Sequence, residues 1–287
     1  MVMQIGMCNE HLSAPPAAAF ATLGALGFDA VEVTPWTFTE DVKRVSDAET
    51  DAIREAAAEA GLAVLGIPRV FKTGDEAHHI GQPPGPSRDR TVAALVATVE
   101  CCAAIGGELV IFGSPNQRAV GDRDPEAVWA AAVETFRAPR LRESLERTGV
   151  SLCMEPLSPP HTDFITTADE AIRFVEAVDH PGVGLCLDGY HLAAEADPVV
   201  EVLERAAPYL RHFHADNTDG LGAAAGELDY DEVIRALAAL GYRGALSLEI
   251  HADILSAEPF GGNPVAIGRE TLAHLHAAGA DGSPRNN

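Results

Sequence analysis

The chain has 287 residues, of which 47% are hydrophobic, and a formal net charge of −23. This acidic excess argues against a nucleic-acid partner, because proteins that bind phosphate backbones present basic surfaces. The five cysteines show no regular spacing and do not suggest a disulfide framework. The N-terminal stretch lacks a basic region followed by an apolar run, and no apolar run is long enough to cross a bilayer, so we expect a cytoplasmic protein without a membrane partner.

Eight apolar runs of strand length recur along the chain, separated by Ala-, Glu-, Arg- and Leu-rich segments of helical character. The predicted strands are residues 3–8, 29–34, 62–67, 108–113, 150–155, 183–188, 210–215 and 245–250. Between strands, residues 168–178 and 229–240 show the i, i+3, i+4 apolar spacing of amphipathic helices. Eight strand–helix alternations predict an α/β protein, a single-domain (β/α)8 TIM barrel over residues 1–277, followed by a disordered tail at 278–287.

The main rival fold is a doubly wound open sheet, whose strands are apolar on both faces. In the fifth predicted strand, Ser151, Cys153 and Glu155 point to one face, while the side chains between them are aliphatic and point to the other. The sixth and eighth predicted strands divide in the same way. Such asymmetry favours a closed barrel with a polar upper lumen, in which Cys153 and Cys186 are small space-fillers rather than nucleophiles.

Four consecutive predicted strands end in side chains of the kind that bind metals, namely Glu155, Asp188, His214 and Glu249. The carboxyl ends of barrel strands meet at the catalytic face, and three carboxylates brought together there repel one another unless a cation compensates. One imidazole with three oxygen donors suits Mn²⁺ best, with Mg²⁺, Co²⁺ or Zn²⁺ also possible. A single strand-end acid is more often the N-cap of the next helix, but the recurrence at four strand ends favours ligands.

Several other histidines and one long loop also call for an interpretation. His191, three residues after Asp188, could contact the substrate or support a metal ligand, and His212 is expected to lie deeper, in the core. Residues 71–90 form the longest aperiodic stretch, rich in Gly and Pro, which is typical of a lid beside an active site. Within that stretch His78 and His79 are expected to face solvent.

Seven short segments of the sequence, taken in their order along the chain, indicate a family. They are GFDAVEV (27–33), FGSPNQR (112–118), MEPLSPPHTDFITTADEA (154–171), LCLDGYH (185–191), HFHADN (212–217), GELDYDEV (226–233) and GYRGALSLEI (241–250). In order and spacing they resemble the xylose isomerase-like TIM-barrel superfamily, in its sugar phosphate isomerase/epimerase branch.

The resemblance implies a metal-dependent sugar or polyol-ketone isomerase or epimerase that works through an enediolate. It implies that the four strand-end residues bind the metal and that Glu155 and Glu249 also act as acid and base on opposite faces of the substrate. The substrate-binding residues assigned with it are His191, His161, Arg118 and Asn9. A homo-oligomer, either a dimer or a tetramer, is expected from the same resemblance.

The chain departs from the family pattern around the substrate. His161 stands where members often carry a glutamate six residues after the metal-binding one, and Gly220 stands where an arginine often follows the metal histidine by six residues. Asn116 replaces a frequent basic residue. Because lysines are rare and no glycine-rich phosphate loop is present, a non-phosphorylated sugar or polyol is favoured.

Alternative functions share parts of this machinery. A metal-dependent lyase or dehydratase acting on a keto-sugar, an inosose or a keto-glycoside would need the same metal and bases. A catalytically silent partner subunit would fit the departures around the substrate. A DNA-repair endonuclease would need more strand-end histidines and a basic groove, which the charge of −23 disfavours.

Overall fold

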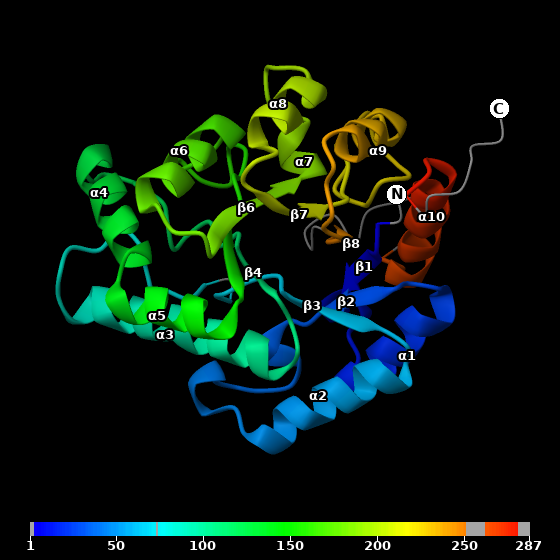
Figure 1. Ribbon diagram of the computed structural model, residues 1–287, viewed down its shortest axis with the longest axis horizontal. Helices are drawn as coiled ribbons and strands as arrows, with labels where there is room; N and C mark the ends of the chain where they lie inside the picture. The colour runs from blue at the N-terminus through cyan, green and yellow to red at the C-terminus, as the bar shows by residue number, and fades with distance from the viewer. Residues whose placement is uncertain (1–2, 73, 251–261, 281–287) are drawn as a thin grey trace.

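The computed structural model describes residues 3–72, 74–250 and 262–280. All eight predicted strands are present, and they pair in parallel in chain order around a closed barrel (Figure 1). The strands are β1 (Ile5–Cys8), β2 (Ala30–Glu32), β3 (Ala63–Ile67), β4 (Leu109–Phe112), β5 (Ser151–Met154), β6 (Val183–Asp188), β7 (Leu210–His214) and β8 (Leu246–Leu248). The barrel closes where β1 pairs with β8, placing Gly6 opposite Ser247. The predicted (β/α)8 fold is therefore confirmed, and the open sheet is excluded.

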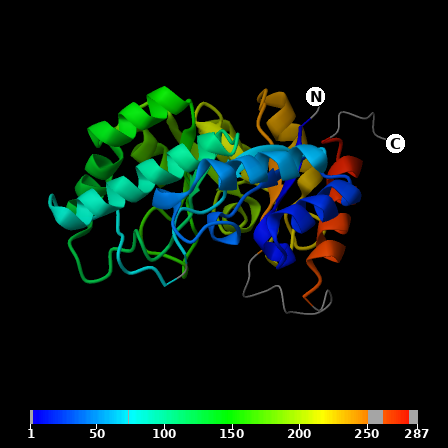
Figure 2. The same cartoon turned by 90° about the horizontal axis from the view of Figure 1, so that it is seen from below.

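Helices surround the barrel on its outside, as Figures 1 and 2 show from two directions. They are α1 (Pro16–Leu26), α2 (Asp47–Glu59), α3 (Pro86–Ala104), α4 (Pro125–Phe136), α5 (Pro139–Thr148), α6 (Ala168–Val178), α7 (Gly189–Leu192), α8 (Val199–Ala206), α9 (Tyr230–Ala239) and α10 (Pro264–Ala277), with short 3₁₀ turns η1 (Asn9–Leu12), η2 (Pro35–Thr37) and η3 (Val42–Arg44).

Local sequence signals mark where these helices start and stop. A capping box opens α2, because the Glu49 backbone N–H donates to Ser46 Oγ at 3.3 Å and the Ser46 N–H donates to the Glu49 carboxylate at 2.8 Å. At the C-terminal end of α5, Gly149 has φ +74°, a conformation that favours glycine. The chain therefore turns directly from α5 into β5, which carries Glu155 at its end.

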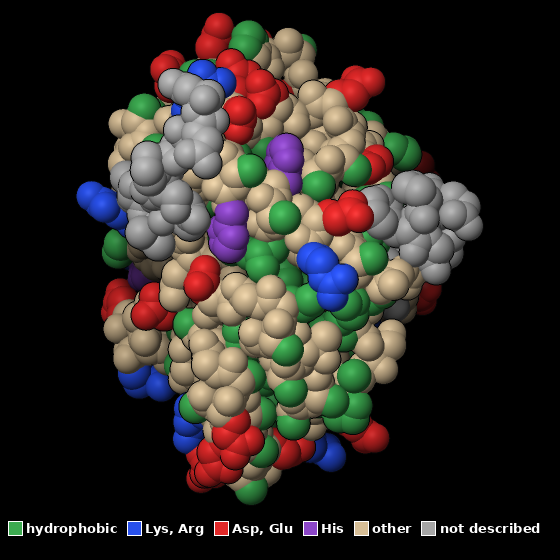
Figure 3. All heavy atoms as spheres, turned by 90° about the vertical axis from the view of Figure 1, so that its right-hand side faces the viewer, with side chains coloured by type: hydrophobic (Ala, Val, Ile, Leu, Met, Phe, Trp, Pro, Cys, Tyr) green, Lys and Arg blue, Asp and Glu red, His purple; other side chains and the backbone are tan. Residues whose placement is uncertain are grey.

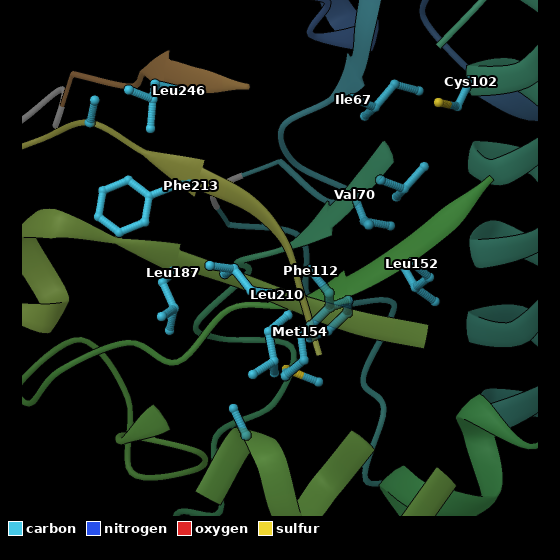
Figure 4. Packing of buried hydrophobic residues seen from close by; sticks show 14 of the residues in the cluster. Ile67, Val70, Cys102, Phe112, Leu152, Met154, Leu187, Leu210, Phe213 and Leu246 are labelled. Atoms are coloured by element: carbon cyan, nitrogen blue, oxygen red, sulfur yellow. The ribbon is translucent and has the colours of Figure 1, made fainter. Parts of the chain in front are cut away.

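The main hydrophobic core lies between the strands and the outer helices. Figure 4 shows outward-facing side chains of neighbouring strands, among them Leu152 and Met154 of β5, packed in this layer. Inside the barrel the apolar contacts are much smaller: Ile111, Cys153 and Cys186 form one cluster. Burial raises the pKa of the Cys153 thiol to about 12, so this cysteine is an inert space-filler at neutral pH, as predicted.

The stretch predicted as a lid is shorter than expected and is fastened to the barrel. Residues 86–90 belong to α3 because Pro86 begins that helix, so the predicted range 71–90 is wrong at its end. Ile80 is fully buried; its N–H donates to the Gln117 carbonyl at 2.9 Å, and its carbonyl accepts from Thr135 Oγ1 at 2.7 Å. The described part of this loop is thus anchored near its centre.

The two histidines of this loop are half-buried, so the prediction that they face solvent is wrong. His78 stacks on Phe71, with ring centroids 4.8 Å apart, and pairs with Asp75 at 2.9 Å. His79 Nε2 lies 3.0 Å from the Ala119 carbonyl. Both rings tie the loop to its surroundings.

Part of the predicted tail is described. Ala278 and Ala280 are buried, and the Met3 N–H donates to the Ala280 carbonyl at 2.8 Å, so residues 278–280 pack beside the start of β1. Residues 281–287 lie outside the described residues. Figure 3 shows acidic side chains gathered at several places on one face, with basic side chains beside some of these groups. Among the described residues no helix has the length and apolar character needed to span a membrane.

Candidate metal centre and active site

A cavity of about 230 Å³ opens at the carboxyl ends of the strands. Its lining comes from the loops after β3, β4, β5, β6 and β8, and comprises Arg69, Phe71, Lys72, Gly113, Ser114, Pro115, Asn116, Gln117, Glu155, Leu157, His161, Asp188, His191, Glu249 and Ile250. Three of the four predicted metal ligands, as well as His161 and His191, are among these residues. The cavity therefore lies where a TIM barrel places its catalytic face.

The three predicted carboxylate ligands converge on a ring nitrogen of the fourth, His214. His214 Nδ1 lies 2.9 Å from Glu155 Oε1, 3.1 Å from Glu249 Oε2 and 3.8 Å from Asp188 Oδ2. Their donor atoms all lie within 4.8 Å of one another. His214, Glu155 and Asp188 are buried, and the Glu249 side chain is 15% exposed toward the cavity. Sequence reasoning therefore found a group that the fold brings together.

The electrostatics of this group call for a cation. Burial first, and then the charge of Glu155, raise the pKa of Asp188 to about 7. Burial also raises the pKa of Glu249 to about 8, although His214 and Arg69 oppose the shift. A protonated His214 would compensate only one of the three acids, whereas a divalent ion would compensate two. One nitrogen and three carboxylates are also ligands that divalent ions accept, so the residues present fit such an ion.

Asp188 serves as both a helix cap and a candidate ligand. Its Oδ1 accepts from the backbone N–H groups of Tyr190 at 2.7 Å and His191 at 3.3 Å, which makes it the N-cap of α7. Its Oδ2 faces His214. The two interpretations of a strand-end acid, cap and ligand, thus apply to different oxygens of one carboxylate.

A glycine packs against the Glu155 side chain, and a buried arginine binds the Glu155 backbone carbonyl. A Cβ atom on Gly113, which follows β4, would lie only 1.9 Å from Glu155 Oε2. Arg118 is fully buried and donates to the carbonyls of Ser114 at 3.2 Å, Glu155 at 2.6 Å and Phe112. Burial lowers the pKa of Arg118 to about 10, so the guanidinium remains charged at neutral pH next to the strand end that carries Glu155.

The close approach of Gly113 to Glu155 predicts the effect of adding a methyl group at position 113. Gly113→Ala should displace the Glu155 carboxylate and lower turnover by on the order of 10²-fold, the usual cost of moving a reacting group by about 1 Å. Metal affinity should fall with it, while circular dichroism should show an intact fold. The measurements are steady-state rates and a metal titration, and wild-type values for both would show that the carboxylate can move aside freely.

His191 has a defined tautomer. The Ser158 backbone N–H donates to His191 Nδ1 at 3.1 Å, and a backbone N–H can only donate, so Nδ1 is the acceptor of a neutral ring. The proton of the neutral ring then lies on Nε2, which makes that nitrogen a donor. His161 is exposed and lies edge-on to His191, with ring centroids 5.2 Å apart.

Two predicted substrate contacts do not reach the cavity. Asn9 is fully buried; its Oδ1 accepts from the Thr34 N–H at 2.8 Å and its Nδ2 donates to Thr37 Oγ1 at 3.0 Å. Arg118 directs its donors at backbone carbonyls, as described above. Neither side chain lines the cavity, because each is engaged in holding neighbouring loops, so their role as substrate contacts stays a prediction.

Sequence reasoning missed Arg69 and Lys72, which line the cavity from the loop after β3. Arg69 Nε lies 3.7 Å from Glu249 Oε1, and its other end pairs with Glu10. The Trp36 ring lies under both cations, 5.6 Å from the Arg69 guanidinium carbon and 5.9 Å from Lys72 Nζ. No motif marks these residues, because they reach the cavity only when the barrel closes.

The closed barrel and the four converging donors define a TIM-barrel protein with a candidate metal centre on its catalytic face. A family model described as xylose isomerase-like TIM barrel matches residues 20–278. The chain belongs to this family.

Curated relatives and solved structures agree with this membership. The chain is 27% identical over 232 residues to a D-psicose 3-epimerase of Agrobacterium fabrum, covering 78% of this chain and 75% of the relative. It is 32% identical over 126 residues to a D-psicose 3-epimerase of Ruminiclostridium cellulolyticum, a match that spans 44% of this chain and only 42% of that relative. The crystal structure of D-psicose 3-epimerase with D-tagatose from Clostridium cellulolyticum superposes with a TM-score of 0.80 at 21% identity, covering 97% of this chain and 99% of that one. At this identity the superposition establishes the shared fold.

Proposed function

We propose that the chain is a divalent-metal-dependent sugar epimerase that inverts the carbon next to the carbonyl of a ketose, with Mn²⁺ as its ion. The observation that carries this proposal is the convergence of Glu155, Asp188, Glu249 and His214 beside a cavity about 230 Å³ in volume. The names of the relatives, D-psicose 3-epimerases, favour a ketose over other substrates.

The four converging residues would hold the ion. Backbone N–H groups of α7 fix Asp188, and the close approach of Gly113 confines Glu155. When bound, the ion supplies Lewis-acid stabilisation of negative charge on neighbouring substrate oxygens. Glu155 directly follows β5 and Glu249 directly follows β8, so the two glutamates approach the cavity from well-separated strands. One glutamate removes the proton from C3 of the ketose, and the electron pair of that C–H bond passes into the enediolate. The other glutamate returns a proton to C3 from the opposite face, which inverts its configuration.

The remaining lining residues would orient the sugar. His191 offers its Nε2–H to a substrate oxygen, since Ser158 occupies Nδ1. His161 stands beside it at the rim, where an imidazole can donate or accept. Asn116, Gln117 and Lys72 supply further polar groups to the lining of the cavity. The prediction of a dimer or tetramer and that of a cytoplasmic location stay predictions.

The direct test is an incubation with candidate ketoses in D₂O. NMR should show the C3 epimer of at least one of D-fructose, D-psicose, D-tagatose or L-ribulose, with deuterium at C3 of the product. Release of water or of an aglycone together with an enone would instead establish the lyase alternative. If the metal-loaded protein neither converts nor exchanges any of these ketoses, and also does not eliminate from keto-glycosides, the proposed function is rejected.

A further inference from the structure

Below the four candidate ligands lies a second buried polar cluster, centred on Glu32 at the end of β2, which the proposed function does not use. Glu32 is fully buried on the inner face of the barrel. Its Oε2 accepts from Ser247 Oγ at 2.6 Å and from Cys8 Sγ at 3.2 Å. His212 Nε2 lies 3.2 Å from its Oε1, and His214 Nε2 lies 3.4 Å from its Oε2.

The barrel register explains why these groups meet. Cys8 of β1 lies opposite Glu32 of β2, and Ser247 of β8 lies opposite His214 of β7. One level of the lumen is thereby built from four strands around the barrel closure. The carboxylate of Glu32 is held by donors from β1 and β8 and lies against both histidines of β7, so its position is fixed from several sides.

His214 stands between this cluster and the candidate metal centre. Its Nδ1 faces the carboxylates of Glu155 and Glu249, at 2.9 and 3.1 Å, and its Nε2 faces Glu32. A neutral imidazole carries one proton, and a ring nitrogen binds a metal only through its lone pair. The ring is therefore a ligand at Nδ1 only in the tautomer that carries its proton on Nε2.

We infer that Glu32 is a positioning residue that holds the His214 proton on Nε2 and so keeps Nδ1 available as a metal ligand. A carboxylate that accepts from the outer nitrogen of a ligating histidine fixes both the tautomer and the ring orientation. The inference rests on the proposed metal centre. It competes with a different use of the same atoms, because Glu32, His212 and His214 also offer donor atoms within 4.8 Å of one another and could hold a second ion.

The first test measures metal affinity. Glu32→Gln keeps the size of the side chain but removes its charge, and its amide can turn a donor toward His214. We expect the variant to bind Mn²⁺ roughly 10- to 100-fold more weakly, the usual effect of losing such a partner. Ser247→Ala is the matched control, because it removes a donor to the same carboxylate oxygen but leaves the charge facing His214; its loss of affinity should be clearly smaller.

The second test reports the hydrogen bond between His214 and Glu32 and does not depend on catalysis. In ¹⁵N-histidine-labelled protein loaded with diamagnetic Zn²⁺, NMR should show the Nε2–H proton of His214 shifted downfield and protected from exchange by the Glu32 carboxylate. In Glu32→Gln this proton should move upfield and exchange faster. Melting temperatures of the metal-free variants separate this effect from a general loss of stability.

Several outcomes would overturn the inference. One is an Nε2–H signal of the Zn²⁺-loaded protein that Glu32→Gln leaves unchanged, and another is an Mn²⁺ affinity in Glu32→Gln within about 3-fold of wild type. A third is two ions per chain of which one is lost in Glu32→Gln, since Glu32 would then be a ligand. Failure of the metal centre itself gives a different result, in which the wild type binds no ion at all. The inference then falls together with the metal centre, whereas a wild type that binds Mn²⁺ beside an unaffected Glu32→Gln rejects the inference alone.

Discussion

Glu155→Gln and Glu249→Gln should each lower ketose epimerisation by roughly 10²–10⁴-fold, the range that general acid–base groups contribute. Glutamine keeps an oxygen that can face the ion, but it can no longer take up or release a proton. If the two glutamates work on opposite faces, each variant should still exchange the C3 hydrogen of one epimer with D₂O and fail on the other. The two variants should therefore show complementary exchange, which NMR of each pure epimer would record.

Glu204→Gln is the control for these two variants. Glu204 is an exposed glutamate of α8, away from the cavity, so this variant should epimerise ketoses at the wild-type rate. Full exchange of both epimers by both active-site variants would remove Glu155 and Glu249 as the bases, even if metal binding were intact.

Stripping the ion with a chelator should abolish turnover and lower the thermal stability of the chain. Three carboxylates and a histidine converge on one place, and an ion that binds only the folded state adds about 2.7 kcal/mol when its free concentration is 100 times its dissociation constant. Adding Mn²⁺ back should restore both rate and melting temperature. The checks are metal content by atomic spectroscopy, steady-state rates and calorimetry on the same sample. Undiminished turnover in a chain shown to be free of metal would contradict the proposed centre.

The fold, and the convergence of the four candidate ligands, could be predicted because the relevant signals are local. Alternation within β5 separates Ser151, Cys153 and Glu155 from the aliphatic side chains between them, and a two-residue period is enough to assign the inner face. A strand end is likewise visible in sequence, and the barrel geometry brings successive strand ends to one face. The sequence therefore indicates, without any distance, that four side chains meet at this face, namely Glu155, Asp188, His214 and Glu249.

The substrate contacts could not be predicted in the same way. Arg118 lies in a motif that the family associates with the site, yet its guanidinium turns toward the carbonyls of Phe112, Ser114 and Glu155 because these happen to surround it. Arg69, which no motif marks, lies beside Glu249. Which cation faces the cavity depends on how two loops pack, and neither hydrophobic period nor spacing carries that information.

Asp188 also has a consequence for how the site could change over time. One of its oxygens anchors the short helix that presents His191, and the other points at the ligand group. A substitution that kept only one of these functions would either displace the His191 ring or remove one negative charge from the candidate ligand group. Substitutions at this position should therefore be rare in evolution. Diversification toward new sugars is therefore freer at the rim, where His161 is exposed, than at the tip of β6.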